Sequence, residues 1–208
     1  TKYGVGNAND FGANTDAFDA ITRSGVFQNY TAAISGGNEN GRYRASFGYF
    51  DQQGIVRKSG LKKWTTNISG QMKFLESKKL GLDFNIIASQ TREQVAPISN
   101  NSGFEGSLIG QALQWNPTKP LYNPDGTLNI KGVGFTQGNY NPLALSDSYD
   151  DNIKGTNVLA SVSPYFKFSN ELEYRMLASI NYSTGIRRMQ IANWMNLQDI
   201  EGRGFAFY

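Results

Sequence analysis

Apolar side chains recur at every second position along six stretches of the chain. This is the period of a β-strand, in which successive side chains point to opposite faces. The stretches run over 26–34, 43–49, 64–74, 80–88, 158–168 and 172–186, and the positions between the apolar ones are mostly polar. Each stretch predicts a strand with one apolar and one polar face, so the chain as a whole predicts an all-β fold.

The links between these stretches alternate between short and long. A tight polar turn at 36–41 is followed by links at about 51–60, at 76–78, at 93–152 and at 169–170. This rhythm is typical of an antiparallel meander whose short turns all lie on one side. Outer-membrane barrels have short periplasmic turns and longer extracellular loops, so we expect the longest link to be extracellular.

Strand length and aromatic placement favour a membrane barrel over a soluble β-fold. The last two strands continue for about 15 residues, whereas strands of soluble proteins usually have ~5–6 and a membrane strand needs roughly 9–11. Aromatic residues of the apolar face gather at both ends of the strands, as in barrel girdles. They are Tyr43, Phe74, Phe166, Phe168 and Tyr174 near the short turns, and Tyr49 and Trp64 near the long links. We therefore expect a segment of a large antiparallel transmembrane β-barrel, with the even-numbered side chains of the last four strands facing lipid.

Six strands are too few to close a membrane barrel, which needs at least about eight, and lipid does not tolerate unpaired strand edges. We therefore expect a piece of a longer protein. The expected division is a loop at 1–25, four strands within 26–92, a long extracellular loop at 93–152, two strands within 153–187 and a loop at 188–208. Ser102 and Glu105 form a capping box before an apolar helical stripe, so the long loop should carry a short helix.

The composition excludes most catalytic chemistry. The chain has no Cys and no His, which removes thiol nucleophiles, zinc–thiolate sites and Ser-His-Asp catalysis. Its carboxylates are scattered, so we predict neither an enzyme nor a cofactor. The net charge is only +3 and no nucleic-acid-binding motif occurs, so no nucleic acid is expected as a partner.

A soluble or secreted carbohydrate-binding β-module is the alternative interpretation. Such a module would stack sugar rings on exposed aromatic side chains such as Trp115, Tyr122 or Trp194. Dependence on detergent would separate the barrel from this alternative.

Several motifs, in a fixed order, resemble those of the SusC/RagA-type TonB-dependent transporters. They are GANTDAFDAI at 12–21, QNY at 28–30, SGGNE at 35–39, FGYFDQQGIV at 47–56, NPTKPLYNPDG at 116–126 and NPLA at 141–144. Phe18 stands where the family usually has Trp, and Lys119 varies the proline-rich motif. Both departures leave the order of the motifs intact.

The resemblance implies a 22-stranded barrel with an internal plug in the bacterial outer membrane, importing oligosaccharides or peptides with energy relayed by TonB. It also implies a SusD-like surface lipoprotein as partner. The plug and the TonB box are not matched by any part of this sequence. This chain would then supply part of the barrel wall and of the vestibule.

Candidate contact residues fall into two groups. Trp115, Asn116, Tyr122, Arg175 and Arg187 are candidates for contact with substrate, although the arginines could instead pair with Glu171, Glu173 or plug carboxylates. Arg57, Lys58, Lys62, Lys63 and Arg188 gather at the outer ends of strands and are candidates for contact with outer-membrane lipid and lipopolysaccharide. The alternative for the second group is that they are only snorkelling anchors.

No metal site is predicted. Asp147, Asp150 and Asp151 offer carboxylate oxygens to calcium, but their spacing lacks the Gly and the terminal Glu of an EF-hand loop.

Overall fold

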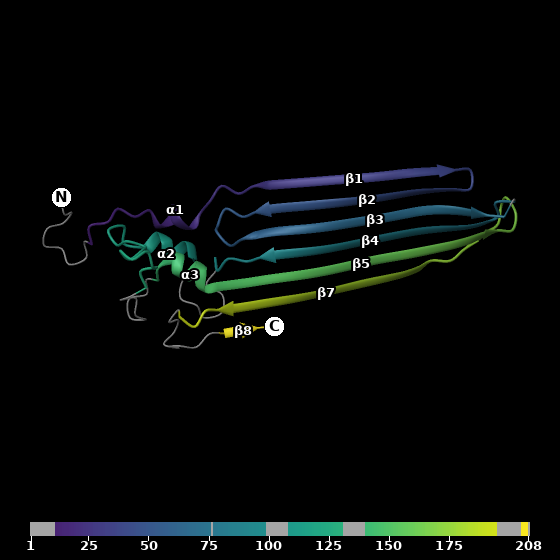
Figure 1. The fold of residues 1–208 in the computed structure, drawn as a ribbon. Helices are drawn as coiled ribbons and strands as arrows, with labels where there is room; N and C mark the ends of the chain where they lie inside the picture. Colours follow the sequence, from purple (N-terminus) through teal and green to yellow (C-terminus); the bar gives the residue numbers. More distant parts are fainter. Residues whose placement is uncertain (1–10, 76, 99–107, 131–139, 195–204, 208) are drawn as a thin grey trace.

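Long antiparallel strands form one open sheet, and the helices gather beyond one end of it (Figure 1). The computed structural model describes residues 11–75, 77–98, 108–130, 140–194 and 205–207. The strands are β1 (Phe27–Asn38), β2 (Gly41–Gln53), β3 (Gly60–Phe74), β4 (Leu80–Gln94), β5 (Tyr149–Lys167), β6 (Glu173–Arg175), β7 (Ala178–Ile191) and β8 (Phe205–Phe207). The helices are α1 (Ala17–Ile21), α2 (Leu108–Gln114) and α3 (Pro142–Ser148).

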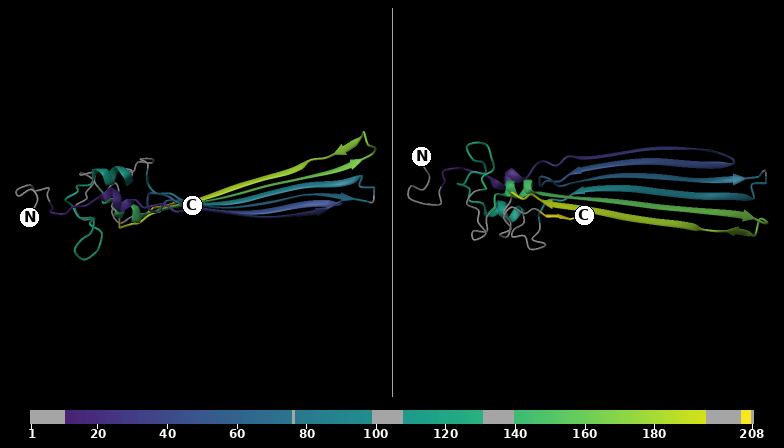
Figure 2. Two further views of the ribbon diagram at one scale, coloured as in Figure 1. Left: turned by 90° about the horizontal axis from the view of Figure 1, so that it is seen from above. Right: turned by 60° about the horizontal axis from the view of Figure 1, so that its bottom comes forward.

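The sheet follows the order of the chain. It runs β1-β2-β3-β4-β5-β7-β8, with β6 also paired to β5, and every pairing is antiparallel. The short turns lie at one end and the helices and long links at the other (Figure 1). We call the sheet the wall, and we call α1, α2, α3 and the 115–130 loop the cap. Figure 2 shows the wall as a single twisted layer, with the cap beyond its end rather than over either face.

The register brings the apolar positions of six neighbouring strands onto one face. One row of direct partners crosses the whole wall and consists of Ile34, Ala45, Ile68, Ile86, Ala160 and Ile180. A slip of one residue in any pairing would move that strand's apolar side chains to the other face. The expected fold class, an all-β antiparallel segment of a barrel, is therefore confirmed, and the sheet is open rather than closed.

Aromatic residues near the cap end of the apolar face contact one another. The rings of Tyr30 and Tyr49 are stacked with centroids 6.4 Å apart, and the Trp64 ring lies 5.7 Å from that of Tyr49. Near the short turns, Phe166 and Phe168 meet edge to face at 4.9 Å. The two aromatic groups lie on either side of the aliphatic row.

The hydrophobic core lies in the cap and at its junction with the wall. Of the described residues in β1 to β7, only Gly81, Asp151, Tyr165 and Ile191 are buried. The core is formed by Ala17, Ile21, Ala96, Leu108, Ala112, Trp115, Leu121, Tyr140, Leu143, Ala144, Leu145 and Ile191. None of the helices in the described parts of the chain is long and apolar enough to cross a membrane.

The sixth expected strand is interrupted. The stretch 172–186 forms β6 and β7 with a break at Met176 and Leu177, opposite Pro164. The carbonyl of Pro164 accepts from the Met176 N–H at 3.0 Å, but Pro164 has no N–H to donate in return. The hydroxyl of Ser163 donates to the Met176 carbonyl at 2.7 Å and satisfies the acceptor that proline cannot serve.

Several element boundaries differ from those expected. β5 begins at Tyr149 rather than at 153, and β7 continues to Ile191. The link between β4 and β5 is therefore 95–148. α1 lies within the expected 1–25 loop, α3 was not foreseen, and β8 lies within the expected loop at 188–208. The capping box at 102–105 falls outside the described residues, and α2 begins shortly after it.

Candidate functional site

Asn141 holds the cap together. It is buried, and its side-chain amide donates to the carbonyls of Leu121 at 2.8 Å and Asn129 at 3.2 Å. Its side-chain oxygen accepts from the N–H groups of Leu143 and Ala144 at the start of α3. The Asn-Pro pair of the NPLA motif is thus a helix N-cap followed by proline in the first turn, where a missing N–H costs little.

The NPTKPLYNPDG motif forms a loop with a buried base and an exposed tip. Asn116 accepts bonds from the N–H and the hydroxyl of Thr118. Near the tip, Asp125 accepts from the N–H and hydroxyl of Thr127, and Gly126 has a φ of +82°, which favours glycine. This chemistry fixes a tight turn that carries Tyr122 and Asp125 into solvent.

Two of the expected sugar-stacking aromatics have opposite surroundings. Trp115 is only 5% exposed, its indole N–H donates to the Lys119 carbonyl at 2.9 Å, and the Lys119 ammonium lies 5.0 Å from its ring centre. Trp115 is therefore a core residue rather than a contact surface. Tyr122 is 51% exposed at the tip of the loop and Trp194 is also exposed.

Arg187 closes the junction between wall and cap. Its guanidinium donates to both carboxylate oxygens of Asp151, at 2.6 Å from Nη2 and 2.9 Å from Nε, and Asp151 is completely buried. Tyr149, which also contacts this carboxylate, lies beside the cap, and burial followed by the charge of Asp151 raises its pKa above the ordinary value. Arg187 is thus held by an ion pair with a residue that sequence reasoning did not consider as its partner.

Arg175 lies at the opposite end of the wall. It forms ion pairs with Asp83 and Glu173, and its guanidinium lies 4.6 Å from the centre of the Tyr165 ring. Arg175 and Arg187 face Tyr165 and Ile153 on β5, a separation of about 40 Å at 3.3 Å per residue. The five substrate-contact candidates therefore do not form one site: Trp115, Asn116 and Tyr122 share the cap loop, and the two arginines lie apart.

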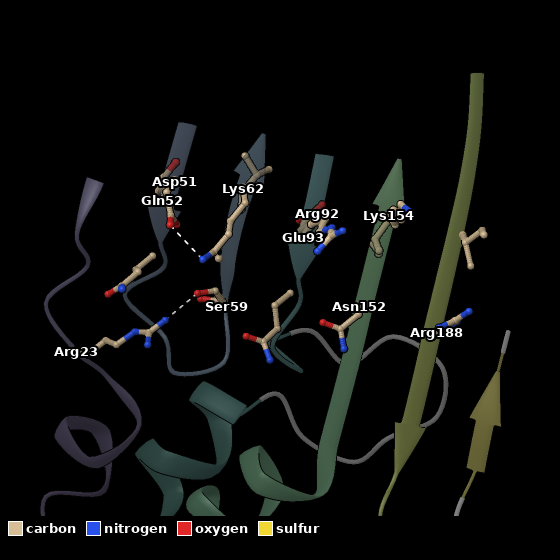
Figure 3. Close-up of a pocket in the computed structure, with 16 residues that line it drawn as sticks. Arg23, Asp51, Gln52, Ser59, Lys62, Arg92, Glu93, Asn152, Lys154 and Arg188 are labelled. Carbon is tan, nitrogen blue, oxygen red and sulfur yellow. Dashed lines mark hydrogen bonds and ion pairs between the residues drawn. The ribbon is translucent and has the colours of Figure 1, made fainter. Parts of the chain in front are cut away.

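A basic cavity opens on the apolar face where the wall meets the cap (Figure 3). It encloses about 580 Å³. Lys62, Arg92 and Lys154 are direct partners on β3, β4 and β5, and Arg188 follows on β7 opposite Asn152. We call these four residues the basic row. Lys62 pairs with Asp51 at 3.2 Å, and Arg92 lies 5.3 Å from the centre of the Trp64 ring.

The five basic residues expected to contact lipopolysaccharide are divided by the structure. Arg57 donates to the Ala20 carbonyl, and Lys58 donates to that of Asp147, so both are bound to the cap. Lys63 alternates with Lys62 and lies on the polar face. Only Lys62 and Arg188 line the cavity. Arg92 and Lys154 were missed, although both share the even-numbered parity of the apolar positions on their strands, which was the available signal.

The three aspartates considered for calcium have separate partners. Asp151 binds Arg187, Asp150 accepts from the Asn152 amide at 2.8 Å, and an oxygen of Asp147 lies 3.9 Å from the Lys58 ammonium. Within the described ranges, no group of three acidic, His or Cys residues is placed to hold a metal ion.

Comparison with known proteins gives consistent relatives. The chain is 31% identical over 165 residues to TonB-dependent receptor P3 of Formosa agariphila, which covers 78% of this chain and 16% of that protein. It is 29% identical over 187 residues to TonB-dependent receptor SusC of Bacteroides thetaiotaomicron, covering 81% of this chain and 18% of that protein. The chain thus spans less than a fifth of the length of these relatives. No family model matches it.

Solved structures show the same fold. A chain of the RagAB peptide importer in its closed-closed state superimposes with a TM-score of 0.70 over 94% of this chain, at 16% identity. A chain of the RagAB peptide transporter gives 0.67 over 88% of this chain, at 15% identity. The aligned region is 22% of the first RagAB chain and 20% of the second.

Proposed function

The chain is a segment of a TonB-dependent receptor of the SusC/RagA type, and from this premise we propose that it forms part of the barrel wall and vestibule of a bacterial outer-membrane nutrient importer. The importer takes up oligosaccharides or peptides with energy supplied through TonB. The cap end faces the cell exterior and the short turns face the periplasm.

One observation carries the proposal: a continuous apolar face crosses six strands and is left uncovered. Ile68 and Ile86, on the inner strands β3 and β4, are each 39% exposed, and the exposed fraction rises to 68% for Ile34 on β1 and 71% for Ile180 on β7. An apolar patch of this extent marks a surface made for lipid or another partner. The strands β1 to β5, with 12 to 19 residues each, are long enough to cross the hydrocarbon core.

The polar face suits a water-filled interior. Its central positions carry small neutral side chains such as Ser69, Asn85 and Ser161, which are neighbours across β3, β4 and β5. Such a face can line a solvated pore without binding a polar solute tightly. The uncovered apolar face does not fit a soluble carbohydrate-binding module. The burial of Trp115 also removes one of the aromatic side chains on which such a module would stack sugar rings.

The cap supplies the vestibule. The exposed tip at 122–127 extends from a rigid base, so it can meet substrate, or a SusD-like lipoprotein that closes over the barrel. The two proposed substrate classes follow from the relatives. Peptides are proposed because RagAB is described as a peptide importer, and oligosaccharides are proposed from the resemblance to SusC-type receptors. No catalytic role is proposed for this segment.

Site-directed labelling tests the orientation. In the full receptor, Cys at Asp125 should react with a membrane-impermeant maleimide on intact cells, whereas Cys at Ser77, in the turn after β3, should react only after the outer membrane is permeabilised. Labelling of Ser77→Cys on intact cells, with Asp125→Cys protected, would reverse the proposed topology.

Uptake of a labelled oligosaccharide or peptide tests the vestibule role. Replacing Tyr122 by Ala should lower uptake severalfold, whereas the matched change Tyr174→Ala should not. Both tyrosines are more than half exposed, but Tyr174 lies on the apolar face near the short turns. Equal uptake by the two variants, together with unchanged uptake after the whole 122–127 tip is replaced by a Gly-Ser linker, contradicts a vestibule role for the cap.

A further inference from the structure

We propose that the basic row and its cavity bind the phosphorylated headgroup of an outer-leaflet glycolipid, the lipid A part of lipopolysaccharide. The inference rests on the outer-membrane location proposed above, and it is independent of what the receptor transports. It assigns a ligand to a surface outside the pore.

The position of the row is the first argument. Lys62 lies two residues beyond Trp64 on the apolar face, towards the cap, and Arg92 and Lys154 continue the same line of partners. Trp and Tyr on a barrel's lipid-facing surface mark the boundary between hydrocarbon and headgroups. Strands of such barrels are tilted about 35–45°, so a row along the register runs obliquely outward from this boundary. The row therefore faces the headgroup layer.

The charge of the row is the second argument. Lys62, Arg92 and Lys154 stand directly opposite one another on adjacent strands, an arrangement in which like charges repel. Asp51 forms an ion pair with Lys62. For Arg92, Lys154 and Arg188 the described residues provide no carboxylate partner. An anion bound between them removes the repulsion, which makes the row more stable with its ligand than without it.

The cavity supplies groups for the rest of a glycolipid headgroup. Gln53, Gln94 and Asn152 line it and offer amides to sugar hydroxyls. Arg23 also lines it and is fixed by hydrogen bonds to the carbonyls of Gly54 at 3.1 Å and Ser59 at 3.0 Å, so the link between β2 and β3 forms a rigid ledge on the cap side. Ile186, the direct partner of Lys154, also lines the cavity. Further along the same face, beyond Gln90 and Thr156, the strands carry the aliphatic band, where acyl chains would lie.

One place therefore offers cations to the phosphate groups, amides to the sugar hydroxyls and an apolar face to the acyl chains of the glycolipid. Independent snorkelling anchors need neither a shared cavity nor direct pairing across strands. Figure 3 shows the basic row on neighbouring strands β3, β4, β5 and β7, and the four side chains line one cavity, which distinguishes a site from scattered anchors.

A charge-matched pair of variants in the full receptor tests the site. The first variant carries K62Q, R92Q, K154Q and R188Q. The control carries R42Q, R44Q, K63Q and K73Q, which removes the same charge from the polar face of β2 and β3. Lipid A that co-purifies with the detergent-extracted receptor is quantified by mass spectrometry, and assembly of the barrel is checked by its heat-dependent shift in electrophoresis.

We expect the basic-row variant to retain at least fivefold less lipid A than the wild type, and the control to retain a normal amount. The purified receptor should bind to vesicles that contain phosphorylated lipid A and should not bind to vesicles that contain the dephosphorylated form. If the variant with all four substitutions does not assemble, the single changes Lys154→Gln and Arg188→Gln should each lower the retention of lipid A about twofold.

Three results overturn the site. Unchanged retention in the basic-row variants leaves only snorkelling anchors, and equal loss in the control means a general charge effect. Displacement of lipid A by millimolar inorganic phosphate means a site for soluble anions. Surface labelling of Asp125→Cys, measured on the same variants, reports the outer-membrane location separately, so a wrong site and a wrong location give different results.

Discussion

The wall and the cap are stabilised in different ways although one chain forms both. The wall has a regular hydrogen-bonded ladder and almost no buried side chains, whereas the cap has little regular structure and holds the core. In the wall, the apolar side chains share one uncovered face, which in the proposed function contacts lipid. In the cap, they face one another, as in a small water-soluble protein.

This difference has a consequence for mutations. A change on the apolar face of the wall should act through the free energy of transfer between water and lipid, so its cost should depend on the depth of the position. A change in the cap should act through packing and hydrogen bonding and should cost the same in lipid as in detergent.

The largest effect is expected at the junction between the two regions. Arg187→Met leaves the buried carboxylate of Asp151 without its cation, which should cost about 3–5 kcal/mol. Hydrogen exchange should show the loss locally, at the Val95 amide that donates to the Asp151 carbonyl. Replacing both members of the pair, with Asp151→Leu and Arg187→Met together, should recover most of the stability. A double variant as unstable as the single one would contradict the ion-pair explanation.

The next effect is expected in the middle of the wall. Phe84 lies on the apolar face of β4, between Leu80 opposite Phe74 and Gln90 opposite Trp64. Phe84→Arg should destabilise the folded barrel by ~2–4 kcal/mol, as charges at the bilayer midplane do. The neighbouring change Asn85→Arg, on the polar face, should cost much less. Folding titrations in liposomes measure both, and equal costs would mean that the faces are assigned wrongly.

A smaller effect is expected at the centre of the cap. Asn141→Ala removes the N-cap of α3 and the side-chain donor to the carbonyls of Leu121 and Asn129, which should cost about 1–3 kcal/mol. Because the cap is independent of lipid, the loss should be equal in detergent and in liposomes. Limited proteolysis at the 115–130 loop measures it, with Asn14→Ala, at an exposed position, as the control. A cost that changed with lipid would remove the distinction between cap and wall.

The sequence predicted the wall well because one periodic signal specifies it. Alternation sets which side chains share a face, and the register then follows from aligning those faces, as the row from Ile34 to Ile180 shows. The interruption at Met176 was missed because its cause lies on the neighbouring strand, where Pro164 lacks a donor. Alternation along one strand carries no information about the partner's missing N–H.

The cap was predicted poorly because its structure depends on contacts between distant residues. The sequence makes Trp115 a candidate for contact with substrate, and only its packing in one cluster with residues of the three short helices makes it a core residue. α3 left one readable signal, the Asn-Pro pair at its start, because Asn is a good N-cap and Pro fits the first turn. The basic row was half predictable. Its even-numbered positions on the apolar face are visible in the sequence, but its four members become neighbours only when β4 pairs with β5 across the long link between them.

That link also affects the order in which the segment folds. The turn between β1 and β2 needs only residues 39 and 40, whereas the link between β4 and β5 spans 95–148. Closing the longer loop costs roughly 2 to 3 kcal/mol more chain entropy, so pairing of β4 with β5 should be the slow step of an otherwise local zippering. A cap that folds on its own core shortens this search, because the Val95–Asp151 hydrogen bond then holds the ends of both strands together. The cap would in this way act as a folding nucleus for the wall, before any substrate reaches it.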